Sequence, residues 1–201
     1  MGRAANDLSA PGDYIGAVQI RHADSDRDAA ACAAIYAPYV SDTVISLEEV
    51  PPSPEEIGHR IARVTERYPW LIAEVDGEMA GYAYAGEHRE RAAYRWASDV
   101  TVYLSPAYFR RGIGRTLYTA LFDLLVFQGV YVACAGVTLP NEASVGLHES
   151  MGFLPVGVYE RVAWKFGSWH DVGWWQLQLV EPSADAPEEL GPPARLDGSG
   201  A

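Results

Sequence analysis

The sequence predicts a single α/β domain built around a mixed β-sheet. Segments that alternate apolar and polar residues, as strands do, are interspersed along the chain with segments of helical periodicity. Asp76-Gly77 stands between two β-rich runs, which is typical of an antiparallel hairpin. A strand, a glycine-containing loop, a helix and another strand follow one another over residues 96–139, which is typical of a parallel crossover. A sheet with both kinds of connection contains antiparallel and parallel strand pairs.

The first part of the chain provides one strand and two helices. Residues 17–23, "AVQIRHA", alternate as a short strand, and the alanine-rich residues 25–40 predict a helix capped by Ser25 or Asp26. Residues 53–68 predict a second helix, because a proline stands at the first helical position and acidic residues fill the first turn. The apolar face of this helix comprises Ile57, Ile61 and Val64.

The rest of the chain provides the other strands and two more helices. Residues 70–87 predict the hairpin, and residues 96–106 predict a strand that ends at a proline. A helix follows the glycine-containing loop, and after it we expect a strand near residues 131–139, a helix near 141–152 and a strand pair within 153–180. The apolar face of the helix after the loop comprises Leu117, Leu121, Leu124 and Leu125.

The chain length bounds the domain organisation. With 201 residues, of which 49% are hydrophobic, the chain can bury one core and is too short for two. Residues 17–180 carry the periodic segments and are expected to form the domain. Residues 1–16 indicate a flexible leader, and residues 181–201, rich in proline, glycine and acidic residues, indicate a disordered tail.

Charge and cysteine content exclude several classes of partner. A net charge of -12 disfavours binding to nucleic acid and to anionic lipid, which need clustered cations. No apolar run approaches the ~20 residues that span a bilayer. The two cysteines, Cys32 and Cys134, lie far apart without metal or redox spacing, which fits a reducing cytoplasm. Small molecules or proteins are therefore the expected partners.

The loop "YFRRGIGRTL", residues 108–117, is the first candidate for a binding site. Gly112 and Gly114 allow close approach of a ligand to the backbone, and the following helix presents its positive end. The loop lacks the ending of a nucleotide P-loop and the three-glycine spacing of a dinucleotide fingerprint. A phosphate site is favoured, and a plain turn with solvated arginines is the alternative.

Several blocks of sequence resemble one enzyme family. "YLSPAYFRRGIGRTL" followed by "LPNEASVGLHESMGFLPVGVY" resembles the two signatures of the GNAT superfamily of acyl-CoA N-acyltransferases. "ERYPWLIAEVDGEMAGYAYAG", "RAAYRWASDVTVYLSP" and "FGSWHDVGWWQLQL" resemble its phosphinothricin N-acetyltransferase group, over about residues 18–180. The resemblance implies the GNAT fold, with a central mixed, mostly antiparallel sheet flanked by helices. It also implies transfer of an acetyl group from acetyl-CoA, as co-substrate and without a metal, in a ternary complex.

The resemblance further implies which residues bind acetyl-CoA. The thioester and pantetheine are expected beside a strand, and the pyrophosphate in the glycine loop. Asn141 is expected to meet the pantetheine arm. Phe109 departs from the family, which usually has glutamine or arginine there, so that side-chain contact is lost. The implied binding residues are Val102, Tyr103, Leu104, Arg110, Arg111, Gly112, Ile113, Gly114 and Arg115.

Two residues are implied as proton-transfer groups. Asp99 stands where the group usually has a glutamate base. A free aspartate has a pKa of about 3.9 and an alkyl ammonium one of about 10, so burial or a relaying water is needed to match them. His148 stands where a tyrosine or histidine acid is usual, and could carry the amine proton or protonate the leaving thiolate. On residue type alone, Asp99 could be a surface acid and His148 a packed or exposed histidine.

The segment "EHRERAAYR" suggests how the amine substrate is bound. Arg89 and Arg91 are expected to bind the anionic group of an amino acid, since guanidinium matches carboxylate and phosphinate oxygens. A solvated charged loop is the alternative from sequence alone. The resemblance implies that further residues line the substrate pocket. These are Leu47, Tyr94, Thr101 and Val172.

The segment "WHDVGWW" contains a possible metal motif, but no third and fourth ligand follow at a recognised spacing, so we expect no metal. Trp169, Trp174 and Trp175 instead suit a homodimer contact, as in the family. The expected substrates are phosphinothricin, methionine sulfone or methionine sulfoximine. The alternatives are an N-acetyltransferase for another small amine, and an acyl-CoA-binding sensor without catalysis.

Overall fold

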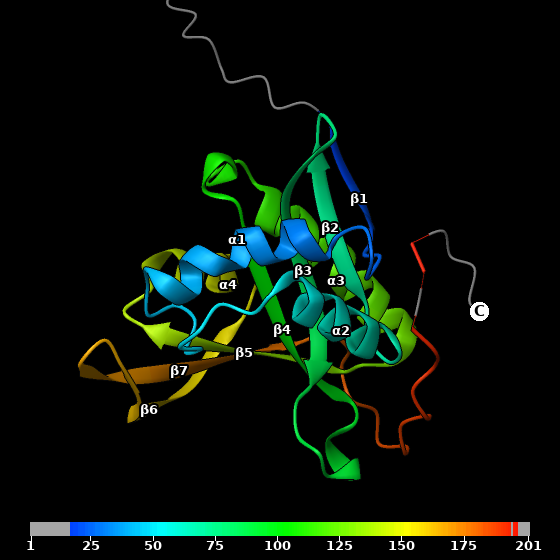
Figure 1. Ribbon diagram of the computed structural model, residues 1–201. Coiled ribbons are helices and arrows are strands. Elements are labelled where there is room, and N and C mark those ends of the chain that lie inside the picture. The colour runs from blue at the N-terminus through cyan, green and yellow to red at the C-terminus, as the bar shows by residue number, and fades with distance from the viewer. Residues whose placement is uncertain (1–16, 194, 197–201) are drawn as a thin grey trace, which may run out of the picture.

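A mixed sheet of seven strands forms the centre of the part of the protein that the computed structural model describes, residues 17–193 and 195–196 (Figure 1). The strand order is β1-β2-β3-β4-β5-β7-β6, and β4 with β5 is its parallel pair; the other neighbours are antiparallel. The predicted mixed, mostly antiparallel sheet is confirmed. The strands are β1 (Val18–His22), β2 (Trp70–Val75), β3 (Glu78–Glu87), β4 (Ala97–Leu104), β5 (Val132–Leu139), β6 (Leu154–Lys165) and β7 (Ser168–Gln178).

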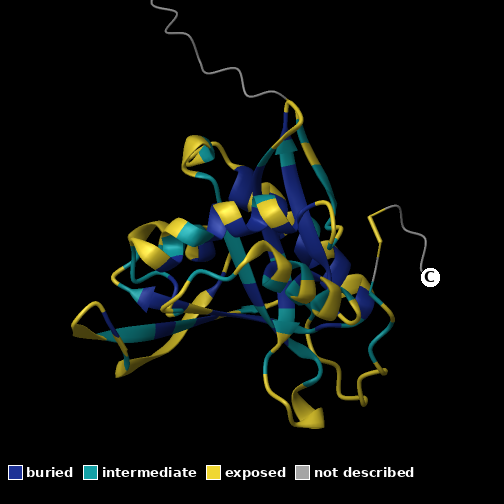
Figure 2. Ribbon diagram, in the orientation of Figure 1, coloured by how far each residue is buried: buried dark blue, intermediate teal, exposed yellow. Residues whose placement is uncertain are grey.

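Helices cover both faces of the sheet, with α1 (Ala29–Ser41) and α2 (Pro54–Thr65) on one and α3 (Ile113–Gln128) on the other. The short helix α4 (Glu142–Ser150) follows β5. Two single turns of 3-10 helix, η1 (Ala92–Tyr94) and η2 (Pro106–Tyr108), lie before and after β4. Buried residues concentrate on the central strands and on the helix faces that meet them (Figure 2). Among the described residues, no helix has both the length and the apolar character needed to span a bilayer.

Local sequence explains where the first two helices begin. The Ser53 hydroxyl accepts a 3.2 Å hydrogen bond from the Glu56 amide, so α2 has the predicted start with Pro54 in its first turn. The expected cap of α1 at Ser25 or Asp26 is wrong, because that helix begins after Asp28. The Asp28 carboxylate instead accepts hydrogen bonds from Arg21 at 2.6 and 2.7 Å, which ties the start of α1 to β1.

Strands β4 and β5 pair over a short length and then separate. The paired residues are Ala97–Asp99 and Val132–Cys134, although β4 continues to Leu104 and β5 to Leu139. Backbone groups on this side of the later half of β4 therefore have no strand partner. This separation opens the middle of the sheet to a ligand.

The tail that the sequence predicts to be disordered lies, over part of its described length, against the domain. Trp96 donates an indole hydrogen bond of 2.8 Å to the Glu188 carbonyl, and the Gly191 amide donates one of 2.8 Å to the Gln128 carbonyl. Leu190 packs against the core beneath α3. The predicted leader, residues 1–16, falls outside the described residues.

Candidate active site

The alternation of side chains along β4 assigns its residues to two faces of the sheet. Val100, Val102 and Leu104 belong to or pack against the core beneath α3. Asp99, Thr101 and Tyr103 consequently project from the other face, where Tyr103 packs with the core beneath α1 and α2. The candidate base thus lies on the same face of the sheet as Tyr103.

Asp99 lies where β4 and β5 separate, since it forms the last pair with Cys134. Its Oδ1 atom lies 2.6 Å from Nδ1 of His88, which follows the end of β3. Burial raises the pKa of Asp99 above its ordinary value, although the hydrogen bond from His88 and the charge of Arg89 oppose that rise. A raised pKa makes a carboxylate a stronger base and so better able to accept a proton from an amine.

The predicted residues Arg89 and Tyr94 lie near this pair. The Arg89 guanidinium stands over the Trp174 ring at 5.5 Å, and the same ring lies 6.0 Å from the His88 imidazole. The Tyr94 ring lies 5.9 Å from His88 on another side. His88 and Trp174 were not predicted as site residues. Antiparallel pairing of β3 with β4 carries His88 to Asp99, and the register that determines this meeting is not visible in either strand alone.

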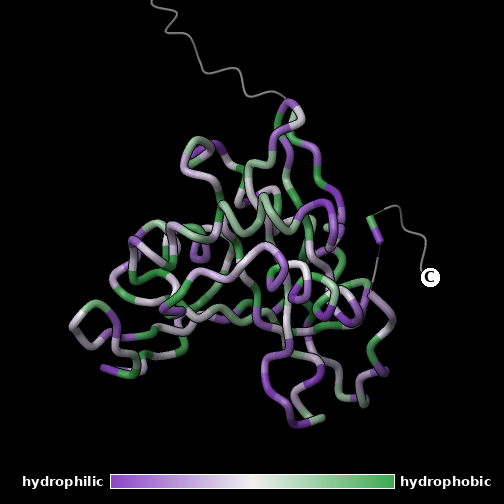
Figure 3. Tube along the Cα trace, in the orientation of Figure 1, coloured by the Kyte–Doolittle hydropathy of each residue, from purple (hydrophilic) through white to green (hydrophobic). Residues whose placement is uncertain are grey.

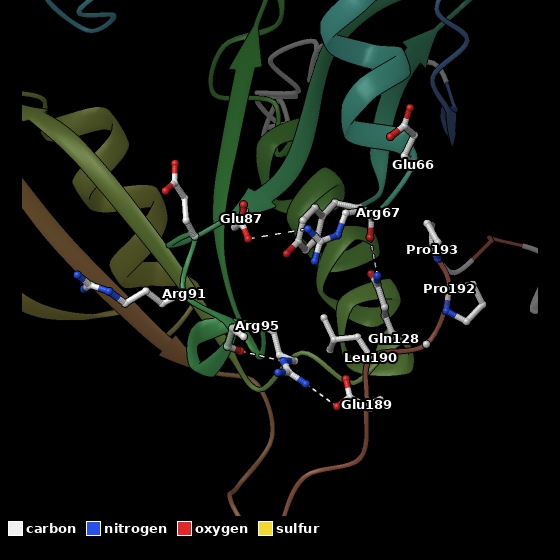
Figure 4. A pocket seen from close by; sticks show the side chains of 14 residues that line it. Glu66, Arg67, Glu87, Arg91, Arg95, Gln128, Glu189, Leu190, Pro192 and Pro193 are labelled. Atoms are coloured by element: carbon white, nitrogen blue, oxygen red, sulfur yellow. Dashed lines mark hydrogen bonds and ion pairs between the residues drawn. The ribbon is translucent and has the colours of Figure 1, made fainter.

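Arg91 lines a different cavity, of about 540 Å³, between the β3–β4 connection and the tail (Figure 4). In this cavity Gln128 donates a 2.5 Å hydrogen bond to the Arg67 carbonyl, and Arg95 pairs with Glu189. The Arg91 side chain extends away from Arg67 and Gln128. Arg91 thus borders this cavity, whereas Arg89 stands over the Trp174 ring.

A cavity of about 430 Å³ lies on the Asp99 face, between the segment after α1 and strands β4, β5 and β7. Two predicted substrate residues, Leu47 and Val172, line it together with the ring of Tyr103. Thr101, also predicted, lies opposite Tyr84 in the β3–β4 pairing and does not line this cavity. The full lining comprises Tyr36, Ile45, Ser46, Leu47, Glu48, Tyr103, Gly136, Thr138 and Val172.

Polar contacts hold the cavity wall formed by residues 45–48. The Tyr36 hydroxyl lies 2.7 Å from the Ser46 hydroxyl and donates a 2.9 Å hydrogen bond to Glu48. Arg60 of α2 contacts the same carboxylate at 2.6 Å. Lys165 of β6, 4% exposed, donates hydrogen bonds to the carbonyls of Val40, Thr43 and Ser46. Burial lowers the pKa of Lys165 from its ordinary value. The wall is thus fixed from α1, α2 and β6.

The glycine loop has the conformation expected of an anion site. Gly112 caps α3 with φ 79°, in the left-handed region that favours glycine, and a Cβ there would meet nothing within 4 Å. Glycine is favoured at position 114 for a different reason, because a Cβ there would lie 3.2 Å from the Leu147 side chain of α4. The first amides of α3 point toward the open end of the helix, where an anion is stabilised. The loop therefore fits a pyrophosphate.

The arginines around this loop are exposed, as is Phe109 at 48%. Arg110 has a φ of 60°, and Arg111 stands over the Tyr108 ring at 5.7 Å. Arg115 donates hydrogen bonds of 2.9 and 3.1 Å to the hydroxyl and carbonyl of Ser150, which link α3 to the end of α4. These exposed guanidinium groups add positive charge where the amides converge.

Backbone directions refine the predicted contacts of β4. The Ser105 amide donates to the Ala80 carbonyl of β3, so the Leu104 amide points away from β3. The Tyr39 hydroxyl accordingly contacts Leu104 from that other side, at 2.6 Å from its carbonyl and 3.4 Å from its amide. By the same alternation Val102 turns its backbone groups toward the gap. Tyr103 turns its own toward β3 and offers its ring to the cavity.

Asn141 and His148 are already engaged within the fold. Asn141 caps α4 by accepting a 3.1 Å hydrogen bond from the Ser144 amide. His148 is 3% exposed, with Nε2 3.0 Å from the Tyr118 hydroxyl and Nδ1 2.8 Å from the Ser144 carbonyl. Burial lowers the pKa of His148, against the hydrogen bond to Ser144. An imidazole with both nitrogens bonded in a core favours a packing role over the predicted acid role.

Among the described residues, one cluster has three side chains of metal-binding type within 4.8 Å: His88, Asp99 and Cys134. His88 Nδ1 is directed at the carboxylate, and burial raises the pKa of the Cys134 thiol to about 11, so the thiol stays protonated near neutral pH. The arrangement is a hydrogen-bonded pair beside a neutral thiol. We assign no metal to it.

Comparisons with known proteins agree with this geometry. The "Acetyltransferase (GNAT) domain" family model matches residues 20–174. A phosphinothricin N-acetyltransferase of Streptomyces viridochromogenes is 40% identical over 170 residues, which cover 85% of this chain and 92% of the relative. A methionine sulfoximine/methionine sulfone acetyltransferase of Salmonella typhimurium is 38% identical over 61% of this chain and 72% of its own.

Solved structures show the same likeness. A GNAT phosphinothricin acetyltransferase of Sinorhizobium meliloti in complex with acetyl-CoA superposes with a TM-score of 0.81 at 32% identity, over 86% of this chain and 94% of that one. An acetyltransferase of Salmonella typhimurium with acetyl-CoA superposes with a TM-score of 0.79 at 34% identity, over 85% and 99% of the two chains.

Proposed function

Because the chain belongs to the GNAT acetyltransferase family and uses acetyl-CoA, we propose that it acetylates the amino group of a small anionic amino acid. The relatives named above for phosphinothricin and for methionine sulfoximine or sulfone define the substrate class. The observation that carries the proposal is the position of Asp99, at the separation of β4 and β5 and on the face that holds the 430 Å³ cavity.

In the proposed reaction the neutral amine attacks the thioester carbonyl directly. Asp99 takes one proton from the ammonium form, and the neutral nitrogen then forms the C–N bond. The C–S bond breaks, and the second proton lost by the nitrogen passes to the leaving thiolate, which gives the amide and the CoA thiol. The backbone amides of Val102 and Leu104 that face the gap would donate hydrogen bonds to the pantetheine and the developing oxyanion. The raised pKa of Asp99 supports its role as base.

The pyrophosphate of acetyl-CoA would bind the first amides of α3. These belong to Ile113, Gly114 and Arg115, and Gly112 supplies the required turn. The exposed guanidinium groups of Arg110 and Arg111 would add charge-assisted hydrogen bonds. The Asn141 oxygen makes the capping bond, and within the part of the chain that the structure describes its amide nitrogen forms no hydrogen bond, which supports the pantetheine contact.

We propose that Arg89 binds the anionic end of the substrate and that Tyr94, Thr101, Leu47 and Val172 shape its surroundings. The stacking of Arg89 on Trp174 fixes its guanidinium near Asp99, which supports this assignment. Arg91 has no comparable support, since it lines the other cavity.

A homodimer is proposed from the exposed apolar side chains of β6 and β7. The edge strand β6 exposes 54% of Trp164 and 65% of Val156, and Trp169 is 57% exposed. Unpaired strand edges with large apolar groups favour association. Trp175, by contrast, is 7% exposed and Trp174 belongs to the site, so of the three predicted tryptophans Trp169 fits a dimer contact. We place the enzyme in the cytoplasm, which the free cysteines support.

The experiment is a steady-state assay of released CoA thiol with phosphinothricin, methionine sulfoximine, methionine sulfone and a polyamine. We expect turnover with the anionic amino acids and little with the polyamine. Asp99→Asn should lower kcat/KM by about 10²- to 10³-fold. Arg89→Gln should raise the KM of the amino acids, while Arg91→Gln, the matched control, should not. The proposal would be contradicted if the enzyme acetylated only the polyamine, or if it acetylated none of the four amines.

A further inference from the structure

We propose that His88 is the positioning residue of the base, holding one oxygen of Asp99 so that the other faces the cavity. The inference rests on the proposed acetyl transfer. It adds a residue outside the two signature motifs to the catalytic arrangement.

The order of residues on the sheet face supports this role. Asp99 pairs with Gly86 of β3, and His88 lies two residues beyond Gly86, just after the end of the strand. Tyr103, which lines the 430 Å³ cavity, lies four residues from Asp99 in the opposite direction. The imidazole is therefore behind the carboxylate as seen from the cavity.

The contact itself is short and occupies one carboxylate oxygen. His88 Nδ1 lies 2.6 Å from Oδ1 of Asp99. Neutral imidazole with its proton on Nδ1 donates to that oxygen and leaves Oδ2 as the acceptor for the amine proton. An aspartate has one methylene fewer than a glutamate, so its reach depends more strongly on being held in one orientation.

The side chains around His88 hold its ring in place. The Tyr94 and Trp174 rings lie 5.9 and 6.0 Å from the imidazole, and the Cys134 thiol from β5 also lies nearby. Among the described residues Nε2 has no hydrogen-bond partner, and 15% of the side chain is exposed. The contact of Nδ1 with Asp99 is therefore the hydrogen bond of this ring.

Two substitutions test the hydrogen bond. His88→Asn keeps an N–H donor near the Nδ1 position, whereas His88→Leu removes the donor. We expect His88→Leu to lower kcat about 10- to 100-fold with the KM of acetyl-CoA unchanged. His88→Asn should recover most of that loss. His59→Asn, on the exposed face of α2, is the matched control and should behave as wild type.

The results that would overturn the inference are equally specific. If His88→Leu keeps kcat within twofold of wild type, or if His88→Asn is as slow as His88→Leu, His88 does not position the base. If the wild type turns over no amine, the proposed function fails, and the His88–Asp99 pair is then judged by nitrogen NMR of the full chain. A proton on Nδ1 that Asp99→Ala displaces supports the pair, and an unchanged tautomer refutes it.

Discussion

The ammonium group of Lys165 donates a 2.7 Å hydrogen bond to the backbone carbonyl of Ser46, which lies 119 positions earlier in the chain. Two further bonds to Val40 and Thr43, at 2.6 and 2.9 Å, complete its set of three acceptors. A charged group from the β6–β7 hairpin thereby holds the segment that lines the candidate substrate cavity. The carbonyls at the end of α1 also lie at the negative end of the helix dipole, which favours a cation there.

Lys165→Met should destabilise the protein and loosen the cavity wall. The substitution leaves three buried carbonyls without their donor, for which we expect a loss of about 2 to 4 kcal/mol in the free energy of unfolding. Chemical denaturation measures this loss. The KM of the amine should rise more than the KM of acetyl-CoA, and equal rises would argue against a local effect on the wall. Arg63→Met, at an exposed position of α2, is the control.

The two glycines of the α3 loop should respond differently to alanine. Gly112→Ala forces a side chain into a positive φ at a cost of about 1 kcal/mol and disturbs the amides that face the proposed pyrophosphate. Gly114→Ala has ordinary helical geometry and presses on Leu147, a side chain that can move. Calorimetry with CoA should show a larger loss of affinity for Gly112→Ala. The reverse order would place the binding site elsewhere.

Substitution of His148 should alter stability and leave the kcat profile in place. Burial lowers its pKa, so the folded state holds it neutral while the unfolded chain binds a proton below about 6.5. Wild-type stability should therefore decline as pH falls through that value toward the lower folded pKa. His148→Gln should have lower stability at pH 8 and a flatter decline, as followed by thermal unfolding. If the pH profile of kcat for His148→Gln lacks a limb that the wild-type profile has, the result would support the acid role implied by the family resemblance.

Asp28→Asn should cost stability at neutral pH and cost nothing in strong acid. Desolvation opposes the charge of Asp28, but hydrogen bonds from Arg21, the Asp24 amide and Arg27 outweigh it and lower the pKa of the carboxyl. The contribution is present above the unfolded value near 3.8 and disappears as pH falls through the lower folded pKa.

We expect a difference of about 1 to 3 kcal/mol at pH 7, reduced from the value for a fully buried pair because Arg21 is partly exposed. Urea unfolding from pH 7 to pH 2 measures it. Asp26→Asn, on the same turn but exposed, is the control. Its difference from the wild type in the free energy of unfolding should stay the same from pH 7 to pH 2.

The sequence predicts those features that depend on local pattern. The hairpin at Asp76-Gly77, the Ser53 and Pro54 start of α2 and the glycine-capped start of α3 all follow from nearby residues, and the structure confirms them. The start of α1 does not, because Asp28 forms its bond with Arg21 on another element instead of capping the helix locally.

The candidate site depends more on long-range contacts. His88 meets Asp99 through strand register. Arg89 stands over Trp174 of β7, whereas Arg91 borders the cavity against the tail, and both partners are distant in sequence. The burial of His148 depends on Tyr118, 30 positions earlier. The spacing of residues along the sequence does not predict such long-range contacts.

At the end of the charged β3–β4 connection, which is hydrophilic in Figure 3, the Trp96 indole donates a hydrogen bond to the Glu188 carbonyl. During synthesis, the ribosome must add about ninety further residues before that acceptor exists. Until then the proposed substrate-binding segment lacks one of its supports, while the hairpin strands that flank it can already pair. The last step in forming this site is therefore set by translation, and a nascent chain should gain affinity for its amine substrate after the rest of the sheet has assembled.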